Sequence, residues 1–142
     1  TRIERLPLTE EADEPAFLYP DGTMRVAAWQ LFGSLFFGAV NKLEELLDPA
    51  AGHPEVVILD MARLIQLDTT GLEGLENLRD QLQKRGCTLL VCGLNSQPGS
   101  LLYRSGFIDH LGDENVCLDL TAALKRAYIL LPNLMGGSDE DY

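Results

Sequence analysis

The chain has 142 residues, of which 46% are hydrophobic and 23% charged, and this composition predicts one globular domain with a buried core. Its net charge of −11 argues against binding to a nucleic-acid backbone or an anionic lipid surface, because both depend on Lys and Arg. The most apolar segment, residues 31–40, is about half as long as a bilayer span, so we expect no direct membrane insertion.

The first half of the chain predicts a lead-in, a hairpin and a helix. Residues 1–16 are rich in charges, and we expect them to form a linker with little structure. Residues 17–19 and 24–31 are rich in apolar side chains, and the Pro-Asp-Gly turn between them predicts a β-hairpin. Residues 38–47 carry apolar side chains at helical spacing, which predicts a helix that ends before Pro49.

The second half alternates short apolar runs with amphipathic helices. Residues 56–59 and 88–93 predict strands that are buried on both faces, because they are mostly apolar and contain β-branched residues. Between them, leucines at steps of three and four predict a helix that begins after Gly71 and ends near Gly86. We also expect an extended piece or turn at 64–67, a short helix at 100–105, a strand at 116–118 and a helix at 120–130 that packs Tyr128 inward.

Strands and helices alternate along most of the chain, in the order β-β-α-β-α-β-α-β-α. Such alternation predicts an α/β fold with a mostly parallel sheet and right-handed crossovers. We expect four to five strands, an edge hairpin and about four helices. The folded domain is expected to span residues 17–131, followed by a flexible acidic tail at residues 132–142.

The cysteines and histidines lack the spacing of a metal site. Three cysteines without a Cys-x-x-Cys pair predict thiols buried in a protein of a reducing compartment. His53 and His110 are isolated and are interpreted as surface or structural residues. The sequence contains neither a Walker-type phosphate loop nor a Gly-x-Ser-x-Gly elbow. We therefore expect no catalytic residue, no metal ion and no cofactor.

Two acids, Asp60 and Asp68, flank the junction between the strand at 56–59 and the next helix. Two carboxylates at strand ends could bind a metal or work as an acid–base pair. Alternatively, Asp68 caps the helix, because its carboxylate can accept free backbone N–H groups at the positive end of the helix dipole. Thr69 and Thr70 could share this role, and a phosphate added to a hydroxyl there would be well tolerated.

The segment Leu67-Asp68-Thr69-Thr70-Gly71-Leu72, after a strand that ends in Asp60, resembles the signature of the STAS domain. The resemblance covers about residues 17–130 and includes the turn Ser105-Gly106-Phe107. STAS domains form anti-sigma factor antagonists and the C-terminal regions of sulfate permease (SulP) anion transporters. The segment Phe32-Gly33-Ser34-Leu35-Phe36-Phe37-Gly38-Ala39 resembles the transporter branch, since free-standing antagonists are usually more polar there.

The resemblance implies a STAS fold and a non-catalytic regulatory or assembly domain of a SulP-type secondary transporter for sulfate, bicarbonate or a related anion. The first residue, Thr1, suits a domain cut from a longer chain at the cytoplasmic face of the inner (plasma) membrane. The implied partners are the membrane part of the same transporter, a second copy of the domain and a cytoplasmic regulatory protein. The implied contact surface contains Asp68, Thr69, Thr70, Gly71, Glu73, Glu76, Asn77 and Asp80.

Two alternatives follow from the same resemblance. The first is a stand-alone partner switch, because in the antagonists a kinase phosphorylates the first hydroxyl after the Asp. That position is Thr69 in this chain, where the family more often has Ser. The second is a nucleotide-binding regulatory module, although Asp60, Asp68 and Glu73 would repel phosphate groups.

Overall fold

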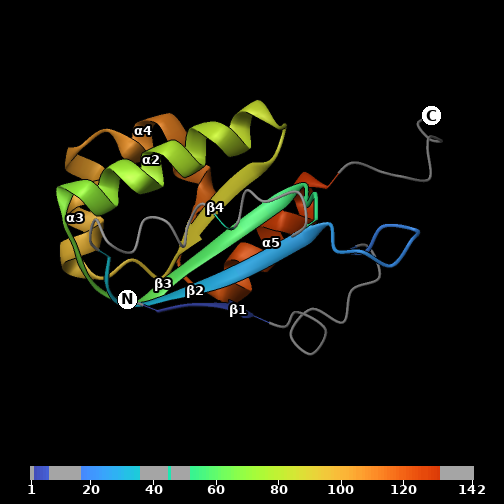
Figure 1. The fold of residues 1–142 in the computed structure, drawn as a ribbon, viewed down its shortest axis with the longest axis horizontal. Coiled ribbons are helices and arrows are strands. Elements are labelled where there is room, and N and C mark those ends of the chain that lie inside the picture. The colour runs from blue at the N-terminus through green and yellow to red at the C-terminus, as the bar shows by residue number, and fades with distance from the viewer. Residues whose placement is uncertain (1, 7–16, 36–44, 46–51, 132–142) are drawn as a thin grey trace.

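The computed structural model describes residues 2–6, 17–35, 45 and 52–131, which form one α/β unit (Figure 1). Its sheet has five strands in the order β1-β2-β3-β4-β5. The strands are β1 (Arg2–Leu6), β2 (Val26–Leu35), β3 (Val56–Leu67), β4 (Thr88–Cys92) and β5 (Val116–Cys117). β1 runs antiparallel to β2 and all other neighbours are parallel, which confirms the predicted fold class.

Helices cover both faces of the sheet. The four helices described are α2 (Thr69–Lys84), α3 (Ser96–Arg104), α4 (Phe107–Leu111) and α5 (Leu120–Leu130). Figure 1 shows α2, α3 and α4 on one face and α5 on the other. Two apolar clusters fill the space between helices and sheet, one under each layer. None of the described helices is long and apolar enough to cross a membrane.

The antiparallel edge of the sheet comes from a different segment than predicted. The predicted reversal is present, since the Arg25 N–H donates to the Phe17 carbonyl at 2.7 Å and the Tyr19 N–H donates to the Thr23 carbonyl at 2.8 Å. It does not form the edge of the sheet, because Leu18 and Met24 make a single antiparallel bridge outside the five strands. The edge is β1, within the segment expected to have little structure. Its Ile3 packs against the cluster under α2–α4, and its Leu6 packs against the cluster under α5. Charged residues lie next to Ile3 and Leu6, so the sequence did not indicate a strand here.

Strand β3 is continuous over 12 residues, whereas the sequence predicted a strand and a separate extended piece. Its second half buries Met61, Leu64 and Leu67, which are three residues apart. Irregular pairing with β2 breaks the usual alternation of a strand, so the pattern did not predict one continuous element. This second half extends beyond the end of β4 and carries the chain to α2.

The helices differ from the predictions mainly at α3 and α4. The helix predicted at 100–105 is α3, which starts earlier and has 9 residues. Phe107 and Ile108 are buried, and they begin the separate helix α4, which the sequence did not predict. α5 has the predicted bounds and buries Ala123 and Ala127. Tyr128 was expected to pack inward and is instead 53% exposed. The helix predicted at 38–47 and the tail at 132–142 lie outside the described residues.

Candidate functional site at the start of helix α2

The turn between β3 and α2 is organised by Asp68. This residue is the N-cap of α2, and its Oδ1 accepts the Gly71 backbone N–H at 2.7 Å. The same Oδ1 accepts the Thr70 hydroxyl at 2.8 Å. The Asp68 carbonyl accepts the Leu72 N–H at 2.9 Å, which starts the helical hydrogen bonds. The predicted cap is therefore confirmed, and it fixes the direction in which α2 leaves the sheet.

The two threonines of the turn have different surroundings. The Thr70 side chain is half-buried and its hydroxyl is bound to Asp68. The Thr69 side chain is exposed on the first residue of the helix. The first backbone N–H groups of a helix lack partners within the helix, so this end favours negative charge. Of the two hydroxyls, that of Thr69 is the accessible one.

Gly71 is required by close packing between α2 and β2. The glycine is buried, and a Cβ atom at this position would overlap the Leu35 carbonyl oxygen. It would also lie 2.9 Å from the Leu67 Cδ1 atom. The Leu35 carbonyl also accepts the Asp68 N–H at 3.4 Å. The first turn of α2 therefore rests directly on the end of β2, and only a residue without a side chain fits there.

β2 pairs with one side of the second half of β3, and β4 does not reach its other side. On that other side, two amide side chains bind the β3 backbone. The Gln97 side chain accepts the Leu67 N–H at 2.8 Å and donates to the Leu67 carbonyl at 2.9 Å. Asn95 donates to the carbonyls of Ala62 and Leu64 at 2.9 and 3.0 Å. These bonds satisfy backbone groups that β4 does not reach. They tie the start of α3 to the turn that carries Asp68, and no sequence pattern predicted this link.

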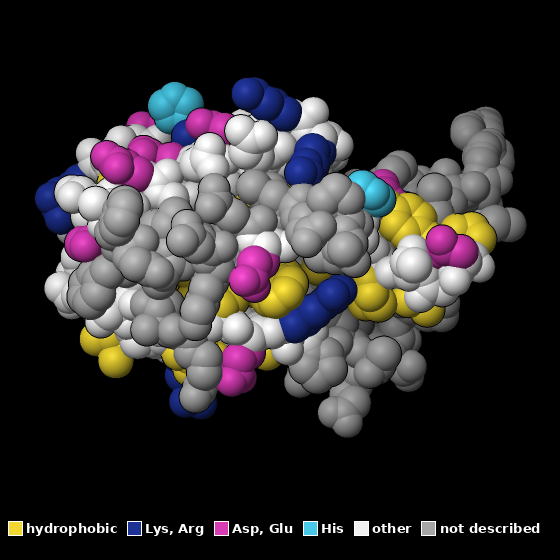
Figure 2. Space-filling view, in the orientation of Figure 1, with side chains coloured by type: hydrophobic (Ala, Val, Ile, Leu, Met, Phe, Trp, Pro, Cys, Tyr) yellow, Lys and Arg dark blue, Asp and Glu magenta, His cyan; other side chains and the backbone are white. Residues whose placement is uncertain are grey.

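The predicted contact residues on α2 form a stripe along its outer side. Glu73, Asn77 and Asp80 are exposed and Glu76 is half-buried. Because they recur at three- and four-residue steps after Thr69, all of them face the same side of the helix. Figure 2 shows Asp and Glu side chains, with some Lys and Arg, over the helices at the upper edge of the view. The structure thus places the turn and an acidic helix face on one continuous surface.

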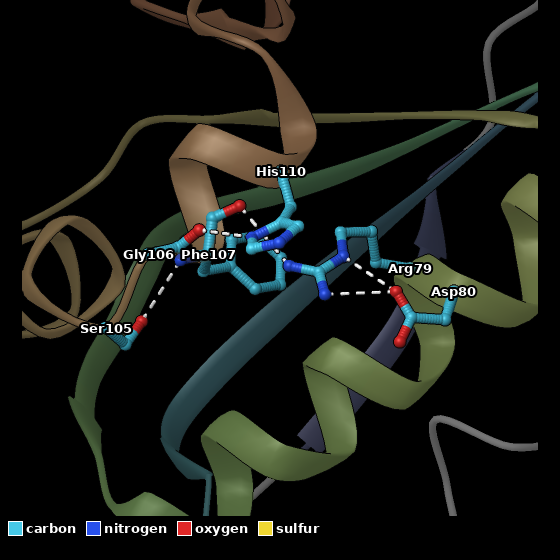
Figure 3. Close-up of polar contacts among 6 residues, drawn as sticks. All are labelled: Arg79, Asp80, Ser105, Gly106, Phe107 and His110. Atoms are coloured by element: carbon cyan, nitrogen blue, oxygen red, sulfur yellow. Dashed lines mark hydrogen bonds and ion pairs between the residues drawn. The ribbon is translucent and has the colours of Figure 1, made fainter.

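Arg79 is a buried charge on α2 that the leucine pattern did not predict. Its guanidinium lies 4.9 Å from the centre of the Phe107 ring and donates to the Phe107 carbonyl at 3.3 Å (Figure 3). Its Nη2 lies 3.0 Å from the carboxylate of Asp80, whose side chain is 54% exposed. Arg79 therefore joins α2 to the start of α4. Asp80, which lies on the outer face of α2, also forms an ion pair with Arg79.

The turn before α4 is held by backbone geometry and two polar side chains (Figure 3). Gly106 has a φ of 86°, a left-handed conformation that glycine adopts readily. The Ser105 hydroxyl accepts the Phe107 N–H at 3.3 Å, and the His110 ring nitrogen Nδ1 lies 3.0 Å from the Gly106 carbonyl oxygen. These contacts account for His110 as a structural residue and orient Phe107 toward Arg79.

Asp60 and Asp68 do not come together. They are eight positions apart along the extended chain of β3 and its end, which corresponds to about 26 Å. Asp60 is buried in the sheet, where it accepts the Gln30 side-chain N–H at 2.9 Å and the Ala62 backbone N–H at 3.0 Å. The hypothesis of an acid–base pair or a shared metal at these two acids is therefore wrong. Among the described residues, no three or more His, Cys, Asp or Glu side chains are placed to hold a metal ion.

Two hollows lie at the far end of α2, about 24 Å along the helix from Thr69. Their volumes are about 280 and 240 Å³, and Gly86 and Cys87 line both. Burial raises the pKa of the Cys87 thiol to about 12, although Arg85 counteracts the effect. A thiol with so high a pKa is a poor nucleophile at neutral pH. These hollows therefore do not add catalytic chemistry to the turn at Asp68.

The parallel sheet, the capped turn and its outer helix face define an α/β domain of the STAS type. The sequence model described as "STAS domain" matches residues 21–123, and the chain belongs to this family. YvdB of Bacillus subtilis, which is named as a sulfate transporter, is 31% identical over 91 residues. The match covers 63% of this chain but only 17% of YvdB, so the chain corresponds to a small part of that protein.

Solved structures give the same family. A sulfate transporter family protein from Wolinella succinogenes superimposes with a TM-score of 0.70 at 34% identity, covering 75% of this chain and 88% of that one. The SulP transporter STAS domain from Vibrio cholerae gives a TM-score of 0.66 at 28% identity, with coverages of 76% and 86%. An anti-sigma factor antagonist from Mycobacterium paratuberculosis shares the fold, with a TM-score of 0.62 at 17% identity over 78% of this chain and 97% of that one.

Proposed function

We propose that this domain is the non-catalytic regulatory or assembly domain of a SulP-type secondary transporter for sulfate, bicarbonate or a related anion. It acts at the cytoplasmic face of the plasma membrane by binding the membrane part of the same transporter. The observation that carries this proposal is the likeness to a sulfate transporter family protein at 34% identity and to a SulP transporter STAS domain at 28% identity, each over about three quarters of the chain. A second copy of the domain and a cytoplasmic regulatory protein are further partners of the proposal.

The contact surface of this proposal is the turn at Asp68 together with the outer face of α2. Thr69, Glu73 and Asn77 are exposed on a helix whose start is held by the Asp68 cap and by the Gln97 hydrogen bonds to Leu67. A preorganised surface loses little conformational entropy on binding, which favours protein–protein recognition. The acidic character of this face fits a basic surface on the partner.

The test is binding between this domain and the membrane part of its transporter, expressed as separate chains and co-purified in detergent. The double variant Glu73→Lys with Asn77→Lys changes the charge of the α2 face. We expect it to weaken co-purification at least tenfold, whereas Glu114→Lys, an exposed reversal near β5, leaves it unchanged. If both variants bound equally well, the outer face of α2 would not be the contact surface. If the unmodified domain does not bind, the proposed function fails.

Phosphorylation of Thr69 is a second candidate function. The difference between the two hydroxyls favours it, since Thr69 is exposed and Thr70 is bound to Asp68. Mass spectrometry of the domain isolated from its own cells tests this directly. We expect one phosphate on Thr69 that is lost in Thr69→Ala and kept in Thr70→Ala. The absence of phosphate, or its persistence in Thr69→Ala, would reject the switch.

A further inference from the structure

Two cysteines lie directly opposite each other at the far edge of the sheet. Cys92 is the last residue of β4, Cys117 is the last residue of β5, and the pairing register sets them side by side. The Gly93 N–H donates to the Cys117 carbonyl at 3.3 Å, so the strands are still paired at this point. Both residues pack in the apolar cluster under α5, so both side chains lie on the same face of the sheet.

This register is compatible with the geometry of a disulfide. Neighbouring strands lie about 4.7–4.9 Å apart, and a disulfide joins Cα atoms that are about 4.4–6.8 Å apart. Residues that pair in register on adjacent strands direct their side chains to the same face. The remaining cysteine, Cys87, immediately precedes the first residue of β4, five positions or about 16 Å from Cys92. Of the two other cysteines, only Cys117 therefore lies within reach of Cys92.

We propose that Cys92 and Cys117 are a modification site, at which a hydroperoxide oxidises the two thiols to a cross-strand disulfide. The proposal rests on the strand register and the shared face, and it holds whether or not the domain serves a transporter. The bond would fix the two-residue strand β5 to β4. Asp119, the N-cap of α5, follows two residues after Cys117, so the bond would also restrain the start of α5.

The chemistry needs two steps and hydrogen peroxide as the two-electron oxidant. The Cys117 thiolate attacks one peroxide oxygen and breaks the O–O bond, which gives a sulfenic acid and, after protonation, one water. Cys92 then attacks the Cys117 sulfur, the S–O bond breaks, and the hydroxide leaves as a second water with the Cys92 proton. In balance, two thiols and one peroxide give one disulfide and two waters.

Accessibility sets the order of these steps. Cys92 is fully buried, whereas Cys117 is partly exposed and meets the oxidant first. Burial raises the pKa of Cys92, and the neighbouring Asp60 carboxylate raises it further. Burial also raises the pKa of Cys117, but Arg126 opposes that shift. Cys117 is therefore the better attacking thiol, and both cysteines react slowly compared with an activated redox cysteine.

To test the proposal, the folded 142-residue chain is oxidised with excess hydrogen peroxide and analysed by mass spectrometry without reduction. We expect free thiols to fall from three to one and the chain to lose two hydrogen atoms. A proteolytic peptide pair linked through Cys92 and Cys117 should appear and vanish after dithiothreitol. Cys87→Ser is the matched control, since it removes the third thiol and should leave the linkage intact.

Two variants make the assignment falsifiable. Cys117→Ser and Cys92→Ala should each abolish the internal linkage, and Cys117→Ser is also expected to fold because its site is only partly buried. Three results would overturn the proposal: no loss of thiols in the folded chain, linkage through Cys87, or conversion of Cys117 to a sulfinic acid or an intermolecular disulfide in place of the internal bond.

Discussion

Gly71 gives the sharpest test of how the turn is built, because the same change at another glycine should have the opposite effect. In Gly71→Ala, the new methyl group would overlap the Leu35 carbonyl oxygen and lie 2.9 Å from the Leu67 Cδ1 atom. The Leu35 oxygen belongs to the backbone of β2, so it cannot rotate away. α2 or the end of β2 must therefore shift, and overpacking of this kind costs about 1–3 kcal/mol.

The matched control is Gly99→Ala on α3. A Cβ atom there would meet only the Leu94 Cβ at 3.5 Å, which is an ordinary van der Waals contact. Replacing glycine by alanine in a helix without strain stabilises a protein by about 0.4–1 kcal/mol. Both glycines lie near the start of their helices, so local helix propensity should affect the two variants similarly.

Equilibrium unfolding in urea, followed by circular dichroism, measures both variants. We expect Gly71→Ala to lower the free energy of unfolding by about 1–3 kcal/mol and Gly99→Ala to raise it by about 0.5 kcal/mol, with unchanged slopes. The argument for close packing of α2 on β2 would be refuted if Gly71→Ala were as stable as the parent chain. A loss of equal size in Gly99→Ala would also refute it.

Three further predictions use the same unfolding assay. Asp68→Ala should cost about 1 kcal/mol because the cap is lost, and Asp68→Asn should retain most of that stability; equal loss in both would contradict capping. Gln97→Leu should cost about 1–3 kcal/mol because both backbone groups of Leu67 lose their partner, whereas Gln83→Leu on the surface should change little. The Cys87 thiol has a pKa of about 12 in the fold against 9.0 when unperturbed, so the unfolded chain loses this proton first. Stability should therefore fall as pH rises from about 9 toward 12, and Cys87→Ala should make that fall shallower; an identical pH profile would reject this cause.

Helix α2 and its entrance could be predicted from the sequence for local reasons. Leucines at steps of three and four define its buried face, and Leu72, Leu75, Leu78 and Leu82 are all buried. The Asp68 cap depends on residues within one turn, so the sequence contains all the information that it needs. Elements held by such local interactions were predicted with their correct type.

The features that were missed depend on contacts between distant segments. β1 becomes a strand because Ile3 and Leu6 pack against residues far away in the sequence, and its own charges indicate a linker. Gln97 and Arg79 are polar residues whose roles arise only when α3 and α4 pack beside β3 and α2. A polar residue on a helix usually faces solvent, so the sequence did not predict that Gln97 and Arg79 bind backbone groups of other elements.

The division between Thr69 and Thr70 also required the structure. The sequence placed both hydroxyls at the helix entrance, and either could have bound the Asp68 carboxylate. Only the geometry assigns that bond to Thr70 and leaves Thr69 exposed. The proposal that Thr69 is phosphorylated therefore has two supports: the exposure of Thr69 in this turn, and the resemblance to antagonists that are phosphorylated at this position.

Anion uptake by the proposed SulP-type transporter that contains this domain tests the central claim most directly. Radiolabelled sulfate uptake should be measured in cells that express the intact protein, the Glu73→Lys with Asn77→Lys variant, or the Glu114→Lys control, each normalised to the amount of protein at the membrane. The account predicts that the α2 variant loses most of its uptake or fails to assemble in the membrane, while the control transports normally. Normal uptake and normal assembly in the α2 variant would contradict it.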